Sequence, residues 1–205
     1  MNAPTRRAAV LALWAATGLC AAQAVPAPAS TVRLRGTVQA VTAGTLTVRD
    51  HSGEVVELVM PDTLVVSEVF AISLADIKPG AFIGTAALPQ ADGTQRAIAV
   101  TVFPESARGT GEGHRPFDLQ PQSTMTNATV AEVVATPAGR QLQLKYKDGG
   151  LTLVVPPDAP VVSSRRGDRS LLVPGASVSL AAQLVDGKPT VLRINAGRGG
   201  FSLPY

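Results

Sequence analysis

An internal repeat is the feature of this sequence that most restricts the folds open to it. The stretch VMPDTLVVS at residues 59–67 returns as VPPDAPVVS at residues 155–163. Further matches keep the same order along the chain: Thr37-Val38 with Thr129-Val130, Pro79-Gly80 with Pro174-Gly175, and Asp92-Gly93 with Asp186-Gly187. An ordered series of matches separated by small shifts is typical of a duplicated domain whose turns have changed length. We therefore expect two domains of the same fold.

Each copy has the period-two hydrophobic pattern of β-strands. In residues 31–40, Val32, Leu34 and Val38 fall on one face, whereas Arg33 and Arg35 fall on the other. Similar alternation recurs in residues 45–49, 54–60 and 95–103, and in the matching parts of the second copy. The sequence thus predicts an all-β protein.

One short helix is expected in each copy. In the first copy, Ser73 is a candidate N-cap with Asp76 three residues later, and Pro79-Gly80 ends the helix. In the second copy, Asp168 is the candidate cap and Pro174-Gly175 the stop. About five strands and one short helix in about 70 residues fit a small closed barrel of the OB kind. A two-sheet sandwich is the alternative.

These patterns divide the chain into five parts. We expect a leader at residues 1–24, a barrel at 31–103, a central strap or linker at 104–127, a second barrel at 128–197 and a tail at 198–205. The leader combines Arg6 and Arg7 with a short apolar run and the small-residue site Ala22-Gln23-Ala24, as secretory signal peptides do. A retained anchor helix is the alternative. Nothing in these residues separates Sec export from twin-arginine export.

Removal of the leader would change the composition in two ways. The single cysteine, Cys20, would be lost, so neither disulfides nor thiolate chemistry would be available. Loss of Arg6 and Arg7 would lower Lys plus Arg from 18 to 16 against 15 acids, a net charge of +1. Such a charge, with only 4% aromatic residues, argues against a nucleic-acid-binding protein. No later stretch is apolar for long enough to cross a membrane as a helix.

Motifs of common enzyme classes are absent from the sequence. It has no GxSxG, no Walker loop and no GxGxxG in a βαβ frame. We therefore expect no catalytic activity and no cofactor. A Ser/His/Asp site assembled only in space would make the protein an envelope hydrolase, which is the least favoured hypothesis.

The central stretch GTGEGHRPFDLQPQSTMTN, residues 109–127, differs from the rest of the chain in composition. His114 with Glu112, Asp118 and Met125 could bind a metal ion, and the alternative is a surface imidazole paired with a carboxylate. The prolines stiffen this stretch, so we expect an ordered strap between the barrels. In that case Arg115 and Phe117 are candidate ligand-binding residues.

A second candidate is the basic loop of the second copy. Arg165 and Arg166, with Arg169, could hold an anionic glycan, a lipid headgroup or nucleic acid. The alternative is a solvated loop that Asp168 partly neutralises.

The chain also resembles a known family. The series Gly36-Thr37-Val38, Leu46-Thr47-Val48, Ile77-Lys78-Pro79-Gly80, Asp92-Gly93 and Ala97-Ile98, with the block at residues 108–134, is similar to a bacterial exported family of unknown function with tandem OB-like barrels. Members are often labelled "metal ABC transporter permease", although this chain has no set of membrane-spanning helices. The resemblance implies a fold and an exported location without an activity.

Three functional hypotheses follow in order. The first is a periplasmic or secreted, non-enzymatic binding or structural module for an unidentified envelope ligand or protein, and we expect a monomer. The second is a metal-handling accessory protein with its site in the strap. The envelope hydrolase is the third.

Overall fold

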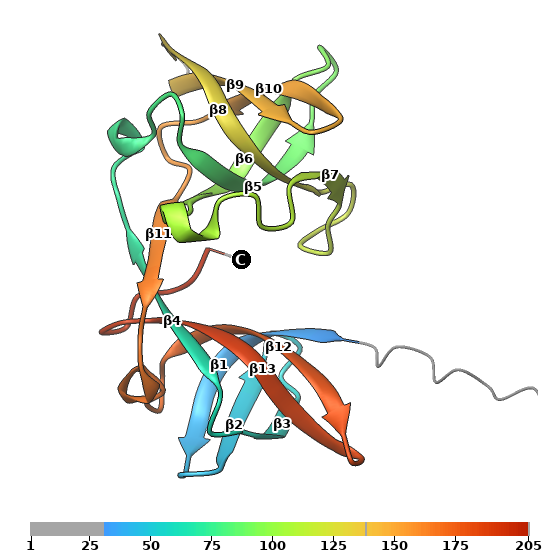
Figure 1. Cartoon of the computed structure of the whole chain (residues 1–205), viewed down its shortest axis with the longest axis vertical. Helices are drawn as coiled ribbons and strands as arrows, with labels where there is room; N and C mark the ends of the chain where they lie inside the picture. The colour runs from blue at the N-terminus through green and yellow to red at the C-terminus, as the bar shows by residue number, and fades with distance from the viewer. Residues whose placement is uncertain (1–30, 138, 205) are drawn as a thin grey trace, which may run out of the picture.

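The structure is a computed structural model that describes residues 31–137 and 139–204. Its regular elements are β-strands and three single-turn 3-10 helices, which confirms the all-β prediction. The strands are β1 (Val32–Val41), β2 (Thr45–Asp50), β3 (Val55–Val59), β4 (Val65–Ala71), β5 (Phe82–Pro89), β6 (Gln95–Val102), β7 (Gly113–Pro116), β8 (Thr124–Thr136), β9 (Gly139–Tyr146), β10 (Gly149–Val155), β11 (Val161–Arg166), β12 (Ser177–Val185) and β13 (Lys188–Gly197). They close into two barrels, one above the other in Figure 1.

The hairpin of β2 and β3 shows how local sequence sets the strands. Leu46 and Val48 point into the barrel and are fully buried, as their alternation with polar residues predicts. The Asp50 carboxylate accepts hydrogen bonds from the Ser52 hydroxyl and the Glu54 amide, which closes the turn between the strands. Gly53 has a φ of +91° in this turn, a conformation that favours glycine.

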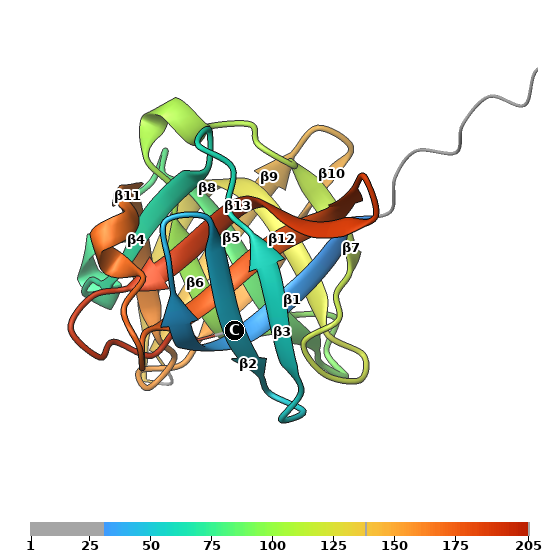
Figure 2. The same ribbon diagram turned by 90° about the horizontal axis from the view of Figure 1, so that it is seen from below.

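The first barrel consists of β1, β2, β3, β12 and β13. β1 pairs antiparallel with β2 and β12, and β13 pairs in parallel with β3 through Thr190 and Val59, which closes the circuit. Figure 2 shows these five strands around the axis of the lower barrel. The core is accordingly mixed: Leu46 and Leu58 of the first copy pack with Leu180 and Ile194 of the second.

The second barrel consists of β5, β6, β8, β9 and β10. β5 pairs antiparallel with β6 and β8, and β10 pairs in parallel with β6 through Leu153 and Gln95. Its core joins Ile83 and Val100 of the first copy to Leu142 and Leu153 of the second.

The two copies therefore exchange strands. Residues 31–103 and 128–197, expected to form one barrel each, do not delimit the barrels of the structure. Each barrel takes three strands from one copy and two from the other. The duplication explains this exchange. The exchanged strands of the two copies have similar alternation of apolar and polar residues, so a strand from either copy can complete either barrel.

β4 and β11 carry the chain from one barrel to the other. They occupy matching places in the repeat and pair antiparallel with each other, with Glu68 opposite Arg165. Equivalent strands that pair in this way are related by an approximate two-fold axis, as in an isologous contact. Neither strand contains a glycine or proline at which the chain could turn back into its own barrel. Both strands therefore remain extended from one barrel to the other.

The expected short helices are single 3-10 turns, at Leu74–Asp76 (η1) and Arg169–Leu171 (η3); a third turn, η2, spans Glu105–Ala107. The Ser73 hydroxyl accepts from the Ala75 amide and the Asp76 carboxylate accepts from the Ser73 amide, so the predicted cap is present. The turn cannot grow because Pro79 disfavours helical backbone in the residue before it. Among the residues the structure describes, no helix is long and apolar enough to cross a membrane.

Candidate functional site

A cleft of about 820 Å³ lies between the two barrels, and the strap forms part of its wall. Residues of both barrels contribute to it, so only the tertiary fold assembles this site. Its lining comprises Arg33, Ser67, Gly84, Ala86, Thr101, Phe103, Ala107, Thr110, Gly111, Glu112, Arg115, Phe117, Met125, Asn127, Ser164, Ser179, Leu180, Ala181, Arg193 and Asn195.

The first barrel presents a basic outer face to the cleft. Arg33 of β1 lies opposite Ala181 of β12, which in turn lies opposite Arg193 of β13. Residues that are direct neighbours across strands share one face of the sheet, so the two arginines flank the small Ala181 side chain. The adjacent row of the same face pairs Ser179 with Asn195, and with Arg35 of β1, which is bound to Asp118. This wall offers the cationic groups of Arg33 and Arg193 beside the neutral hydrogen-bonding groups of Ser179 and Asn195.

The second barrel presents a neutral face of small residues. Gly84 and Ala86 of β5 lie opposite Asn127 and Met125 of β8. A Cβ atom at Gly84 would lie 2.8 Å from both Asn127 Oδ1 and Phe103 Cε2, so only glycine fits between them. The Asn127 amide nitrogen donates to the Thr110 carbonyl at 2.9 Å and thereby fixes the strap against β8.

The strap crosses the cleft and docks on the first barrel through Phe117 and Asp118. The guanidinium groups of Arg33 and Arg35 lie over the Phe117 ring, 5.7 and 5.2 Å from its centroid. Asp118 accepts from Arg35 at 2.7 Å, and this bond lowers the pKa of the Asp118 carboxyl. The Phe117 and Leu119 side chains are half-buried. The strap is thus an ordered bridge between the barrels.

The charge of the cleft is positive. Arg33, Arg115 and Arg193 face the single acid Glu112, a net charge of +2 for the lining. Within residues 31–137 and 139–204, none of these three arginines forms an ion pair. The Arg115 guanidinium donates to the Gly111 carbonyl at 2.8 Å, which holds it at the rim. Such a site can bind an anion and place an apolar part on Phe117.

The residues predicted as metal ligands do not converge on one point. Glu112 and Met125 line the cleft, whereas His114 points to the other face of β7, where its Nδ1 lies 2.8 Å from the Thr126 hydroxyl. The His114 ring stacks on Tyr146, with 6.5 Å between the centroids. Asp118 is bound to Arg35. In the described part of the chain, no group of three or more His, Cys, Asp or Glu side chains is placed to hold a metal ion.

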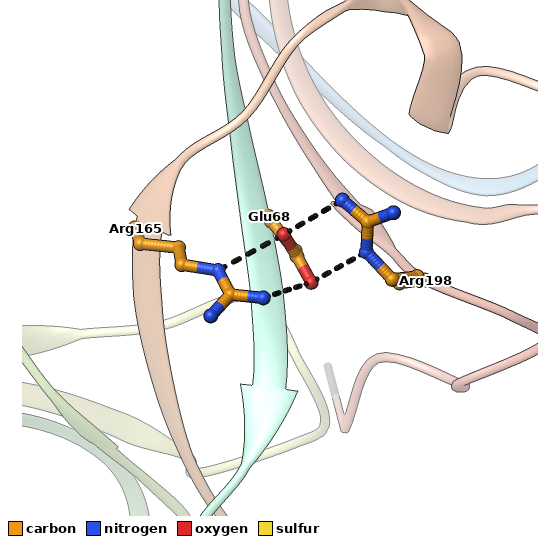
Figure 3. Close-up of polar contacts among 3 residues, drawn as sticks. All are labelled: Glu68, Arg165 and Arg198. Carbon is orange, nitrogen blue, oxygen red and sulfur yellow. Dashed lines mark hydrogen bonds and ion pairs between the residues drawn. The ribbon is translucent and has the colours of Figure 1, made fainter.

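The basic loop of the second copy has a structural partner. Glu68, only 3% exposed, lies between Arg165 and Arg198, each of which makes two hydrogen bonds to its carboxylate at 2.8–3.1 Å (Figure 3). The Arg165 guanidinium also lies over the Phe70 ring at 4.9 Å. This cluster joins β4, β11 and the tail. Arg166 is exposed and lines a separate cavity of about 640 Å³ beside the crossing strands.

The Glu68 cluster predicts a pH-dependent stability. Hydrogen bonds from Arg198 and Arg165 lower the pKa of the Glu68 carboxyl from 4.5 to about 2. Because the folded pKa is the lower one, the stabilisation is full above pH 4.5 and is lost as the pH falls through 2. We expect Glu68→Gln to unfold at lower urea than the native protein at neutral pH, and this difference to disappear near pH 2.

Urea unfolding of both proteins across this pH range measures the effect, with the exposed Glu132→Gln as a control that should match the native protein throughout. High salt should weaken the effect, since the two arginines are about 60% exposed. A difference that stays constant down to pH 2 would contradict the assignment.

The sequence singled out Arg115 and Phe117, which line the cleft, but not Arg33 or Arg193. It also singled out Arg165, as a candidate ligand-binding residue, but not Glu68 and Arg198, with which Arg165 forms a cluster. The only local signal for Arg33 was its place on the polar face of a strand, which solvated residues share. Comparison with known proteins adds no further lead, because no family model, no curated protein and no solved structure matches this chain.

Proposed function

We propose that this chain is an exported, non-enzymatic binding module of the periplasm or extracellular space, made of two OB-like barrels that have exchanged strands. The leader-like sequence at residues 1–24, which lies outside the described residues, supports export. Five-stranded circuits that each contain one parallel closing pair support an OB-like topology.

The binding site of this module is the cleft between the barrels. The observation that carries the proposal is its volume of about 820 Å³ together with three arginines that form no ion pair within the described residues. That volume is in the range of pockets that hold small ligands. Arginine suits carboxylate or phosphate oxygens because its planar donors bind two of them at once. The ligand class is therefore a small anion with an apolar face for Phe117.

A matched pair of sugars tests the charge requirement. Galacturonate and galactose have similar rings, but only galacturonate carries a carboxylate. We expect galacturonate to raise the melting temperature and to bind by calorimetry, and galactose to do neither, because a ligand selective for the folded state stabilises it. Inorganic phosphate, as a third probe, separates a requirement for charge from one for a carboxylate.

Substitution localises the site. Arg193→Ala should weaken galacturonate binding about tenfold or more, the loss of one charge-assisted hydrogen bond. Arg49→Ala removes the same charge from β2, outside the cleft lining, and should leave binding unchanged. Equal binding of galactose and galacturonate, or equal loss in both variants, would overturn the proposed site.

A further inference from the structure

A row of uncharged polar side chains crosses the cleft wall of the first barrel. Ser179 of β12 lies opposite Asn195 of β13, and Asn195 lies opposite Ser67 of β4. All three line the cleft, so their side chains share the face of the sheet that borders it. Because neighbouring strands lie about 4.8 Å apart, the row extends over about 10 Å from Ser179 to Ser67.

The fold does not use the hydrogen-bonding capacity of this uncharged row. Within the part of the chain that the structure describes, none of its three side chains makes a hydrogen bond or an ion pair. The three residues are half-buried, whereas Arg33 and Arg193 in the adjacent row are exposed. The uncharged row is therefore the more enclosed part of this wall, and the arginines stand at its edge.

The opposite wall of the cleft holds a buried oxygen without a partner. Asn127 is 6% exposed, and its Nδ2 donates to the Thr110 carbonyl, which can only accept. The amide is thereby oriented with Oδ1 over Gly84, a cleft residue, and this oxygen has no hydrogen-bond partner among the described residues. Buried acceptors in proteins are normally paired, so Oδ1 suits a donor that a bound molecule supplies.

These groups together favour a hydroxylated ligand. The carboxylate or phosphate of a ligand cannot donate to Asn127 Oδ1, whereas a hydroxyl can. The serine hydroxyls and the Asn195 amide both donate and accept, as the hydroxyls of a sugar do. An ammonium donor is disfavoured, because the cleft lining has a net charge of +2.

The spacing of the arginines suits two acidic groups. Arg33 and Arg193 are separated by β12, so their backbones are about 10 Å apart, as are the two ends of the uncharged row. A single sugar ring is shorter than this row, and two linked rings fit it better. The carboxylates of two successive rings can then each reach one arginine.

We propose that the cleft binds a two-ring segment of an acidic glycan, such as two linked uronates. The carboxylates bind Arg33 and Arg193, and ring hydroxyls bind the uncharged row. A further hydroxyl displaces the edge of the neighbouring Phe103 ring and donates to Asn127 Oδ1. This inference rests on the proposed function, since it uses the same cleft, and it adds the chemical class of the ligand.

Two carboxylates with six-membered rings test the role of the hydroxyls. Cyclohexanecarboxylate keeps the ring size and the carboxylate of galacturonate but has no hydroxyl. We expect calorimetry to show that galacturonate binds at least about tenfold more tightly, because a site built for hydroxyls rejects an analogue that lacks them. Digalacturonate, which can fill the row, should bind at least about tenfold more tightly than galacturonate.

The variant Asn195→Ala assigns the effect to the uncharged row. It should weaken digalacturonate binding about tenfold and leave cyclohexanecarboxylate binding unchanged, whereas Arg193→Ala should weaken both. The fold should tolerate Asn195→Ala, since the change breaks no side-chain hydrogen bond within the described residues. As a control, Gln39→Ala removes an exposed amide from β1 outside the cleft lining and should leave all binding unchanged.

The outcomes separate this inference from the function on which it rests. Failure of galacturonate, digalacturonate and inorganic phosphate alike to bind would overturn the proposed function, and this inference with it. Equal affinity for galacturonate and cyclohexanecarboxylate, or for one ring and two, would overturn only the glycan assignment and leave an anion-binding cleft. Binding of phosphate without either sugar, or unchanged digalacturonate binding in Asn195→Ala, would have the same consequence.

Discussion

Cutting the chain between Gly109 and Thr110 should leave one folded particle instead of two separate barrels. The strap contributes to docking, but the barrels are joined chiefly because each contains strands from both halves of the chain. Separation of the halves would therefore require the unpairing of β1 from β12 and of β5 from β8. A site-specific protease sequence inserted at this exposed turn allows the cut to be made in the folded protein.

Size-exclusion chromatography of the cut protein measures the outcome. We expect elution at the volume of the intact chain, and separation into two fragments only in denaturant. Two fragments that separate under native conditions would show contiguous barrels and contradict the exchange. Trypsin would be a poorer reagent, since Arg108 is bound to Glu105 and to the Gly80 carbonyl.

Ile194→Ala should lower the free energy of unfolding by about 2–5 kcal/mol, the usual cost of such a truncation in a core. Ile194 lies on β13 and is 1% exposed in the core of the first barrel. Leu192→Ala on the same strand should cost less than about 1 kcal/mol, because Leu192 is 37% exposed. Urea unfolding gives both values.

The position of the disturbance tests the topology as well. Ile194 belongs to the second copy but packs with Leu46 and Leu58 of the first. Amide chemical shifts should therefore change in β2 and β3, and stay unchanged around Leu142 and Leu144 of the second barrel. The reverse pattern would place Ile194 in a contiguous barrel.

The candidate site was only half visible in the sequence. Arg115 and Phe117 are close together in an unusual stretch, and this nearness made them candidates. Arg33 and Arg193 are far apart in the chain. They share one face of the sheet, on either side of Ala181, only because both β1 and β13 pair with β12. His114 was a candidate for its chemistry, but strand alternation turns it away from the cleft that Arg115 lines.

The sequence by itself determined the elements of this protein. Alternating side chains specify strands, Gly53 and Asp50 specify a hairpin, and Ser73 with Asp76 specifies a capped turn, because each signal acts over a few residues. The repeat indicated that the barrel strands and the capped turn occur twice, whereas β7 and η2, which lie between the copies, occur once.

Only the tertiary structure decided which copy completes which barrel. Leu46 can pack against Leu180 of the other copy or against the matching strand of its own, and the local patterns allow both. The decision depends on β4 and β11, which run across the gap and meet at Glu68. Pairing between strands so far apart in the chain leaves no local signal in the sequence. The cleft between the barrels is formed only once this pairing has been made.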